Sequence, residues 1–329
     1  KLTVGRVQTP TLAMLVERAG QISNFQKEKY FNVELDCDGI PAVKPKIFDP
    51  DEAEQLRSRC HGNEAIVTSV KETEKKVKAP KLYDLTTLQR EANRIYGMTA
   101  KQTLDTSQSL YEKKLITYPR TDSQYLPEDM EQTARNVVRQ IYEKYQLTGP
   151  FDQTEQPNVK KVMNNSKVTD HHAIIPTLEL ASCHLDELKS WEEKILFLIA
   201  VHTVMAMSKD HIYQETEIEV ECQEEIFKAK GKTVLQDGWK LFENCFKNKD
   251  RMAITDPDQE MKDQIPKVTK GQTFYAVDAE KTEHFTSPPK PYSEDTLLAA
   301  METAGNKEFD EDTEKKGLGT PATRAGIIE

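Results

Sequence analysis

The chain of 329 residues is longer than one hydrophobic core usually organises, so its length predicts two or more domains. Its 37% hydrophobic and 30% charged residues are typical of a globular protein and exclude wholesale disorder. The formal net charge of −10 excludes a protein that simply coats nucleic acid, because such binding needs an excess of Lys and Arg to neutralise phosphates. Any contact with DNA must therefore be local.

The apolar stretches of the chain are too short to cross a membrane. The longest, from Ile195 to Met207, is interrupted by His202 and Thr203 and predicts a buried core helix. The chain begins at Lys1 without the charged-then-apolar pattern of a secretory signal, so we expect a piece cut from a longer polypeptide.

The cysteines favour a reducing compartment. Their number is odd, and no two of them form a Cys-x-x-Cys pair. The five are Cys37, Cys60, Cys183, Cys222 and Cys245. This pattern is typical of reduced thiols and speaks against a zinc site, so we expect a cytoplasmic protein.

The first part of the chain combines a helix with strands. Thr9 as N-cap and Pro10 at the first helical position predict a helix that continues through Ala19. The pattern then predicts a strand at 30–35, a helix at 49–60 and a strand at 65–70. Four residues predict a linker: Lys75, Lys76, Lys78 and Pro80.

From Leu82 the pattern becomes helical. Thr86-x-x-Gln89 and Thr99-x-x-Gln102 are capping-box starts, and Gly97 between them predicts a helix stop. The pattern further predicts a strand at 115–118 and helices near 127–145 and 185–207.

The last part returns to strands and ends in helices. Strands are predicted within 212–285, for example at 215–222 and 272–278, and helices at 293–304 and from Thr320-Pro321 onward. The acidic stretch from Glu308 to Glu314 is expected on a solvated face. The strand-rich part is thus entered, left and re-entered around a helical insertion, which predicts a nested architecture.

The most specific group of polar residues is Thr117-Tyr118-Pro119-Arg120-Thr121-Asp122-Ser123. Pro119 biases Tyr118 toward an extended conformation, in which Tyr118 and Arg120 share a face. This pair suits phosphoryl transfer, with a phenol oxygen as nucleophile and a guanidinium on the phosphate oxygens. A free phenol has a pKa of about 10, so such a nucleophile needs nearby positive charge or a base. The alternative is a tyrosine at a strand end, with Arg120 in a surface ion pair.

A second group is Thr169-Asp170-His171-His172-Ala173, followed by Ile-Ile-Pro-Thr. A histidine beside a phosphodiester can donate to a phosphate oxygen or move a proton. Adjacent residues in an extended stretch face opposite ways, so only one of the two histidines is expected to reach a given site. The alternative is a polar loop that precedes a buried strand.

Two further stretches resemble each other. Gly5-Arg6-Val7-Gln8-Thr9-Pro10 and the stretch from Gly317 to Arg324 both lead into a Thr-Pro helix start. Free amides at a helix start attract phosphate, and Arg6, Gln8, Thr323 and Arg324 could hold a DNA backbone. A plain helix cap is the alternative for either stretch.

Together and in this order, the four stretches resemble type IA DNA topoisomerases, with a likeness to topoisomerase III in Tyr-Pro-Arg and His-His-Ala-Ile-Ile-Pro. The resemblance spans residues 2–328. It implies that Tyr118 forms a 5′-phosphotyrosyl bond, that Arg120 holds the scissile phosphate and that His171 assists. It also implies that Arg6, Gln8, Thr320, Thr323 and Arg324 line a groove for single-stranded DNA.

The resemblance implies a multidomain fold of helices and strands in an open ring, in which a strand-rich arch carries a helical tyrosine-bearing domain. The expected parts are a base domain at 1–29 and 287–329, the arch at 30–81 and 211–286, and the tyrosine domain at 82–210. Family members carry a Toprim domain ahead of the Gly-Arg-Val-Gln stretch, which binds Mg²⁺. None of it is in this sequence, so we expect no metal ligands here and no cleavage by this piece alone.

Single-stranded DNA and a helicase are the partners that the resemblance implies. Two other interpretations compete with it. A DHH-type phosphoesterase would need several further aspartates beside Asp170-His171-His172 to hold two metals, and none is evident. A non-catalytic single-stranded DNA-binding module could use the predicted helix pair at 86–115, but it would have no use for Tyr118 beside Arg120.

Overall fold

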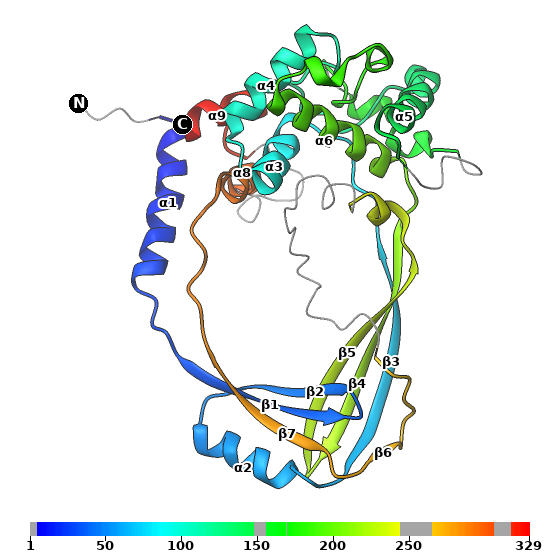
Figure 1. The fold of residues 1–329 in the computed structure, drawn as a ribbon. Coiled ribbons are helices and arrows are strands. Elements are labelled where there is room, and N and C mark those ends of the chain that lie inside the picture. Colours follow the sequence, from blue (N-terminus) through cyan, green and yellow to red (C-terminus); the bar gives the residue numbers. More distant parts are fainter. Residues whose placement is uncertain (1–4, 148–155, 169, 244–264, 306–316) are drawn as a thin grey trace.

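The computed structural model describes residues 5–147, 156–168, 170–243, 265–305 and 317–329. Cys245, Thr169 and the acidic stretch 308–314 lie outside the described residues. Figure 1 shows the chain as a ring, with a helical body opposite a strand-rich arch. Long strands connect the two on one side, and a helix and an extended segment connect them on the other.

The arch is one antiparallel sheet of seven strands in the order β6-β3-β4-β5-β2-β1-β7. The strands are β1 Lys29–Cys37, β2 Ile40–Ile47, β3 Ala65–Val77, β4 His211–Cys222, β5 Glu225–Gln236, β6 Thr273–Phe274 and β7 Asp278–Phe285. Strands from both sides of the helical insertion therefore pair in one sheet, and β3 pairs with β4 along its length.

The end of the arch has its own hydrophobic core. Burial alternates along β1, so that Val33, Leu35 and Cys37 face inward. Helix α2 (Pro50–Cys60) covers this face, with Leu56 buried, and lies where the sequence pattern predicts a helix. The structure shows that the Asp49 carboxylate is its N-cap. This core fixes the far end of the ring.

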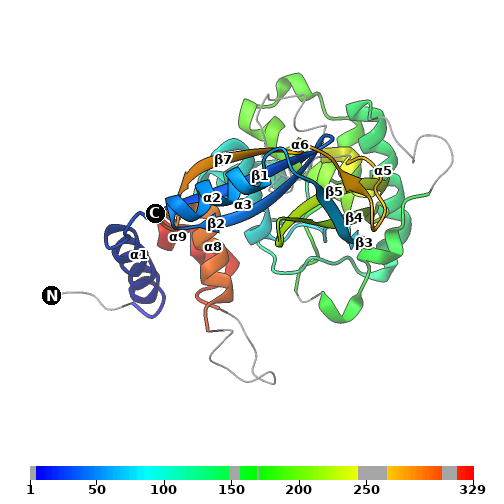
Figure 2. The same cartoon turned by 90° about the horizontal axis from the view of Figure 1, so that it is seen from below.

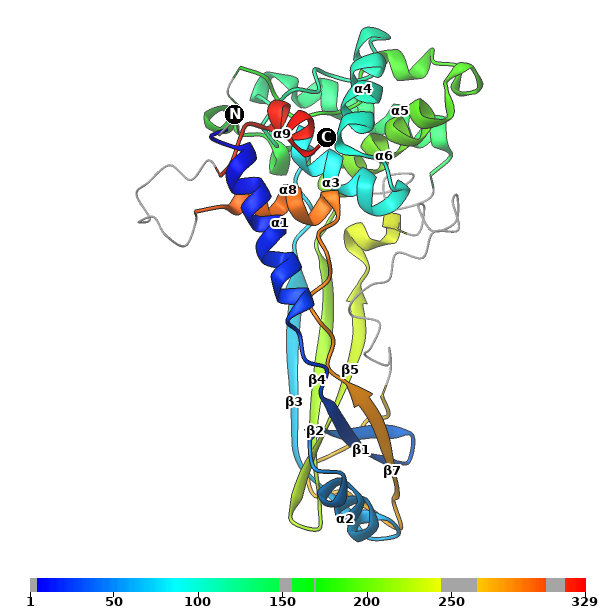
Figure 3. The same cartoon turned by 90° about the vertical axis from the view of Figure 1, so that its left-hand side faces the viewer.

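The strands between the arch core and the helical body carry charged side chains on their surface. Lys230 of β5 lies 2.6 Å from Glu217 of β4, and Lys75 of β3 lies 3.5 Å from Glu215. Figure 3 shows these strands running from the helical body to the arch as a narrow column. Cross-strand ion pairs suit a sheet with solvent on both faces.

The helical body packs around one buried helix, α6 (Ser190–Ala206), whose residues 195–206 are all buried as predicted. Around it lie α3 (Leu85–Tyr96), α4 (Ala100–Glu112) and α5 (Glu131–Tyr145). The short 3-10 helices are η1 Glu128–Met130, η3 Val159–Val162, η4 Asn165–Lys167, η5 Leu178–Ala181, η6 Leu185–Glu187 and η7 Gly238–Phe242.

Three helices outside this body complete the ring: α1 (Gln8–Ser23), α8 (Glu294–Thr303) and α9 (Pro321–Ile328). Helices α8 and α9 contact α3 and α4, and Figure 2 shows α1 and α8 on the same side of the helical body. A small apolar cluster of Ala100, Leu298 and Ala325 lies between α4, α8 and α9.

Several predicted helix starts are correct, and two are displaced. Gly97 closes α3 in the left-handed conformation, and Thr99 with Gln102 forms the capping box of α4, both as predicted. The box of α3 instead uses Asp84 and Thr87, because the N-cap lies two residues before Thr86 and the helix begins at Leu85. Helix α1 begins at Gln8, so Thr9 lies inside it and its hydroxyl accepts from the Gly5 amide.

Three strand predictions were wrong in detail. Lys75 and Lys76 belong to β3 and not to a linker, because their pairing with β4 continues to Val77. Residues 275–277 interrupt the strand predicted at 272–278. Residues 115–118 make a single bridge, from Ile116 to Pro176, and proline lacks the N–H that a longer ladder would need.

Candidate active site

Tyr118 lies on a segment that is hydrogen-bonded to residues 173–177. The Thr117 amide donates to the Ile175 carbonyl at 3.0 Å, and the Thr117 hydroxyl donates to the Ala173 carbonyl at 3.0 Å. The Tyr-Pro-Arg stretch and the stretch after the two histidines are therefore neighbours, although about 50 residues separate them in sequence.

The residues after Tyr118 alternate between buried and exposed. Thr121 and Ser123 are buried, and Arg120 and Asp122 are exposed. The Thr121 hydroxyl donates to the His171 carbonyl at 3.0 Å, so the buried side chains hold the histidine-bearing loop in place. The segment thus has one buried face that holds the loop and one exposed face that carries Arg120 and Asp122.

The Tyr118 ring is half-buried and contacts two other rings. Its centroid lies 4.3 Å from that of His171 and 5.3 Å from that of Tyr111 on α4. His172 does not share this position, because its Nδ1 lies 2.8 Å from the Ala173 carbonyl oxygen. Of the two histidines, the first is the one beside Tyr118.

A cavity of about 180 Å³ lies next to these rings. It is lined by Arg120, Thr121, Asp122, Asp170, His171, Thr320, Pro321 and Ala322. The Arg120 guanidinium is exposed and has no hydrogen bond or ion pair with any residue that the structure describes. A cation without a protein partner therefore lines a small polar cavity, where a phosphate could bind it.

Two glycines shape the stretch that brings Thr320 to this cavity. Gly317 has a φ of +65°, and a Cβ there would lie 2.4 Å from the carbonyl oxygens of Met301 and Glu302. Gly319 has a φ of +69°, and a Cβ there would lie 3.3 Å from Val7. These positions need glycine for both conformation and space. The contact with Val7 also shows that the two Thr-Pro stretches meet in the fold.

The residues predicted to line a DNA groove lie in different environments. Arg6 and Gln8 are exposed at the start of α1. Thr320 caps α9, and the exposed Thr323 takes part in that cap, since its hydroxyl accepts from the Thr320 amide at 3.0 Å.

Arg324 does not face solvent, contrary to the expectation for a groove residue. It is 3% exposed, and its guanidinium donates to the Leu318 carbonyl and the Thr86 hydroxyl, each at 3.0 Å. The helical period places Arg324 on the face of α9 that packs against α3, so its side chain fills that contact and not the groove.

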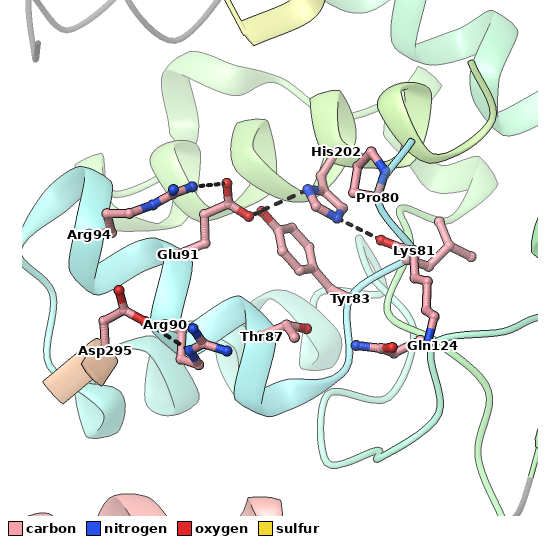
Figure 4. A pocket seen from close by; sticks show the side chains of 11 residues that line it. Pro80, Lys81, Tyr83, Thr87, Arg90, Glu91, Arg94, Gln124, His202 and Asp295 are labelled. Atoms are coloured by element: carbon pink, nitrogen blue, oxygen red, sulfur yellow. Dashed lines mark hydrogen bonds and ion pairs between the residues drawn. The ribbon is translucent and has the colours of Figure 1, made fainter. Parts of the chain in front are cut away.

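A larger cavity, of about 440 Å³, lies between the linker after β3, α3 and α6 (Figure 4). The buried Tyr83 hydroxyl donates to Glu91 at 2.5 Å, and Arg94 lies 2.8 Å from the same carboxylate. His202 stacks on Tyr83 and is 2.7 Å from the Lys81 carbonyl oxygen. These groups pair with one another and include no residue of the four sequence motifs. We therefore interpret their contacts as structural and not as part of the candidate active site.

Tyr111 belongs to none of the four sequence motifs. It lies in the helix that the Thr99-x-x-Gln102 capping box starts, where its spacing indicates packing alone. Tyr111 lies near the end of α4, only seven residues before Tyr118. This short separation, with a helix end between the two residues, was the signal that could have suggested a contact.

The sequence matches the DNA topoisomerase family model over residues 1–329. The chain belongs to the DNA topoisomerase family. DNA topoisomerase 3 of Bacillus licheniformis is 38% identical over 349 residues, covering 100% of this chain and 46% of that protein. DNA topoisomerase 3 of Bacillus subtilis is 38% identical over 348 residues, covering 100% of this chain and 47% of that protein. The chain thus spans about half the length of these relatives.

The fold is that of a type IA topoisomerase. Full-length topoisomerase I from Thermotoga maritima superposes with a TM-score of 0.72 at 26% identity, covering 100% of this chain and 51% of that one. The resemblance drawn from the four motifs and the predicted fold class are therefore confirmed. The membership also removes the DHH phosphoesterase alternative.

No metal site is evident in the part of this topoisomerase chain that the structure describes. No group of three or more His, Cys, Asp or Glu side chains there could hold an ion. Asp122 and Asp170 alone do not provide the ligand set that Mg²⁺ requires.

Among the described residues no helix is long and apolar enough to cross a membrane. The described cysteines are free thiols.

Proposed function

We propose that the complete polypeptide is a type IA DNA topoisomerase of the topoisomerase III kind. It cleaves one DNA strand, passes another through the break and reseals it, which relaxes or decatenates DNA. The observation that carries the proposal is the meeting of three stretches, distant in sequence, around Tyr118, His171 and the cavity lined by Arg120 and Thr320. The fourth stretch adjoins them through Val7, which lies next to Gly319. The topoisomerase 3 relatives support the choice of kind.

In the proposed cleavage the Tyr118 hydroxyl oxygen attacks a backbone phosphorus. The bond from phosphorus to the 3′ oxygen breaks, the tyrosine loses its proton, and the leaving oxygen gains one to become a 3′-hydroxyl. The phosphate stays on Tyr118 as a 5′-phosphotyrosyl ester. Resealing is the reverse reaction, and it needs no ATP because one phosphate ester is exchanged for another.

Arg120 and His171 have distinct roles in this reaction. The guanidinium of Arg120 pairs with two phosphate oxygens and stabilises the charge that grows on them in the transition state. His171, whose ring contacts Tyr118, donates to the phosphate or moves a proton near it. These assignments follow from residue type and position.

The remaining predicted residues belong to strand binding in this proposal. Arg6, Gln8, Thr320 and Thr323 contact the DNA backbone on one side of the cavity, and Arg324 supports them from within α9. The base domain at 1–29 and 287–329, the arch at 30–81 and 211–286, and the tyrosine domain at 82–210 are the proposed working parts. A helicase as partner and a cytoplasmic location belong to the same proposal.

Mg²⁺ is expected for the complete enzyme, with its ligands in the Toprim domain that the resemblance to type IA topoisomerases implies. We therefore expect this chain alone to be inactive in cleavage. It should bind single-stranded DNA weakly, with an affinity that falls as salt rises.

The test is capture of a covalent protein–DNA adduct. The complete polypeptide is incubated with a labelled single-stranded oligonucleotide and Mg²⁺ and run on a denaturing gel. We expect an adduct from the native protein and from the control Tyr275→Phe, which changes an exposed tyrosine of the arch. Tyr118→Phe should give none and should bind the oligonucleotide as before.

Two results would contradict the proposal. An adduct from Tyr118→Phe would remove Tyr118 as the nucleophile. Tight binding without any adduct from the native protein would favour the non-catalytic single-stranded DNA-binding module. A third result, an adduct from this chain alone, would contradict only its expected inactivity, because the catalytic groups would then all lie within its 329 residues.

A further inference from the structure

Tyr111 contacts the candidate nucleophile in a defined geometry. The rings of Tyr111 and Tyr118 meet at an interplanar angle of 73° with centroids 5.3 Å apart, which is an edge-to-face contact. Tyr111 is 40% exposed, so burial of its own ring does not explain the position. The contact constrains the direction in which the Tyr118 ring points.

The frame that holds Tyr111 is rigid. Its neighbours Ser109 and Lys113 both bond to the buried carboxylate of Glu192 on α6, at 2.7 and 2.6 Å. The last turn of α4 is thereby fixed to the central helix of the body. Tyr111 cannot shift without breaking these two bonds or changing its own rotamer.

The chain between Tyr111 and Tyr118 is equally constrained. Lys114 adopts a φ of +61°, and the Leu115 amide donates to the Leu110 carbonyl at 2.9 Å, which closes the helix. The Thr177 hydroxyl donates to the Lys114 carbonyl. The position of the Tyr118 backbone relative to α4 is thus fixed, and it brings the rings of Tyr111 and Tyr118 into contact.

The other ring beside Tyr118 belongs to a loop and not to a helix. His171 is exposed, although its backbone carbonyl accepts from the Thr121 hydroxyl. Its ring also lines the cavity, where a DNA phosphate would compete for its contacts. Of the two aromatic neighbours, only Tyr111 stands on a helix and can fix Tyr118 independently of DNA.

We propose that Tyr111 is a positioning residue, whose ring edge holds the Tyr118 ring in the orientation for attack on the phosphorus. This rests on the proposed function, in which Tyr118 is the nucleophile. The effect depends on an aromatic ring at position 111 and not on its hydroxyl. It acts on the rate of cleavage of bound DNA and not on DNA affinity.

The experiment compares three substitutions at position 111 in the complete polypeptide: Tyr111→Phe, Tyr111→Leu and Tyr111→Ala. Cleavage is measured in a single turnover at saturating single-stranded oligonucleotide, with affinity and thermal unfolding measured in parallel. We expect Tyr111→Phe to cleave at the native rate. Tyr111→Leu and Tyr111→Ala should cleave about 10- to 100-fold more slowly, because small misplacements of a reacting group cost this much. Affinity and unfolding temperature should stay native.

The matched control is Tyr275→Ala, which removes an exposed ring of the arch and should change nothing. A native cleavage rate for Tyr111→Ala would overturn the inference, and so would an equal loss in Tyr111→Phe, which would assign the role to the hydroxyl. Loss of affinity with a native saturated rate would make Tyr111 a DNA contact instead. Tyr118→Phe separates failure of the proposed function from failure of the positioning role. An adduct from Tyr118→Phe would refute the proposed function. An inactive Tyr118→Phe together with a native cleavage rate for Tyr111→Ala would refute only the positioning role.

Discussion

At the scale of residues, the Tyr-Pro-Arg-Thr-Asp-Ser segment alternates between buried side chains, which hold it in place, and exposed side chains, which can contact a ligand. Pro119, Thr121 and Ser123 are buried, and the Ser123 hydroxyl donates to the Lys167 carbonyl at 2.8 Å. Arg120 and Asp122 stand between them and are exposed. The extended backbone produces this alternation, because successive side chains point to opposite sides. Arg120 can then face a ligand while its neighbours fix its position.

This arrangement predicts the outcome of Arg120→Lys in the complete polypeptide. A lysine keeps the charge but presents one ammonium in place of a planar fork, so it cannot hold two phosphate oxygens at once. We expect cleavage to fall about 100-fold, with only a small change in affinity. Single-turnover cleavage checks this, with Lys71→Arg, at an exposed position of β3, as a charge-conserving control. Native cleavage by Arg120→Lys would mean that the guanidinium points away from the phosphate.

At the scale of elements, Asp210 joins the helical body to the arch. It lies between α6 and β4, and its carboxylate accepts from the Ala79 amide at 2.9 Å and from Lys161. Lys76 lies 3.2 Å from the second oxygen, and Gln236 donates to the Asp210 carbonyl at 2.7 Å. The linker that leaves the helical body thus carries a carboxylate that is bonded to the linker that enters it.

The pKa of Asp210 predicts how this joint responds to acid. Burial by itself would raise the pKa, but hydrogen bonds from Lys161, Ala79 and Lys76 outweigh it and lower the pKa to about 2. Because the folded pKa is below the unfolded one, the contribution to stability is present above about pH 4 and is lost as the pH falls toward 2.

Asp210→Asn should therefore lower the free energy of unfolding at pH 7 by about 1–2 kcal/mol. Its stability should also depend less on pH between 4 and 2 than that of the native chain. Urea unfolding over a pH series measures both effects, with Asp129→Asn, an exposed residue of η1, as the control. Parallel pH profiles for the native chain and Asp210→Asn would contradict the assignment.

At the scale of the whole molecule, the ring closes through a contact of modest apolar content. Arg90 of α3 lies 2.8 Å from Asp295 of α8, and the Ala100 amide donates to Glu294 at 2.5 Å. Arg324 of α9 reaches Thr86 at 3.0 Å. Polar contacts of this kind separate at lower cost than a large apolar core, so this contact is compatible with the strand passage that the proposed function requires.

A charge exchange tests whether this contact holds the ring closed. Arg90→Glu places a carboxylate beside Asp295, and we expect it to weaken closure by about 1 kcal/mol, roughly a fivefold rise in the open population. Adding Asp295→Arg should restore closure. Distances between spin labels at Glu112 of α4 and Thr303 of α8 report the opening, and Arg94→Glu, whose partner Glu91 lies within α3, is the control. An unchanged distance distribution in Arg90→Glu would show that other contacts keep the ring closed.

The sequence by itself determined the elements whose signals are local. The predicted helix starts at Thr99 and Thr320 and the stop at Gly97 mark real helix ends, because a cap acts over three or four residues. The continuous apolar run at 195–206 likewise predicted a helix buried on all sides. The order of four motifs was enough to identify the family and the fold.

Only the tertiary structure decided which residues meet, because contacts between distant segments depend on packing that no local pattern encodes. It buried Arg324 in the contact with α3 and extended β3 through Lys75 and Lys76, since β4 supplied a partner strand. It brought Val7 against Gly319 and His171 against Tyr118. The end of α4 set Tyr111 against Tyr118, a relation fixed by the bonds of its last turn to Glu192, 80 residues further along the chain.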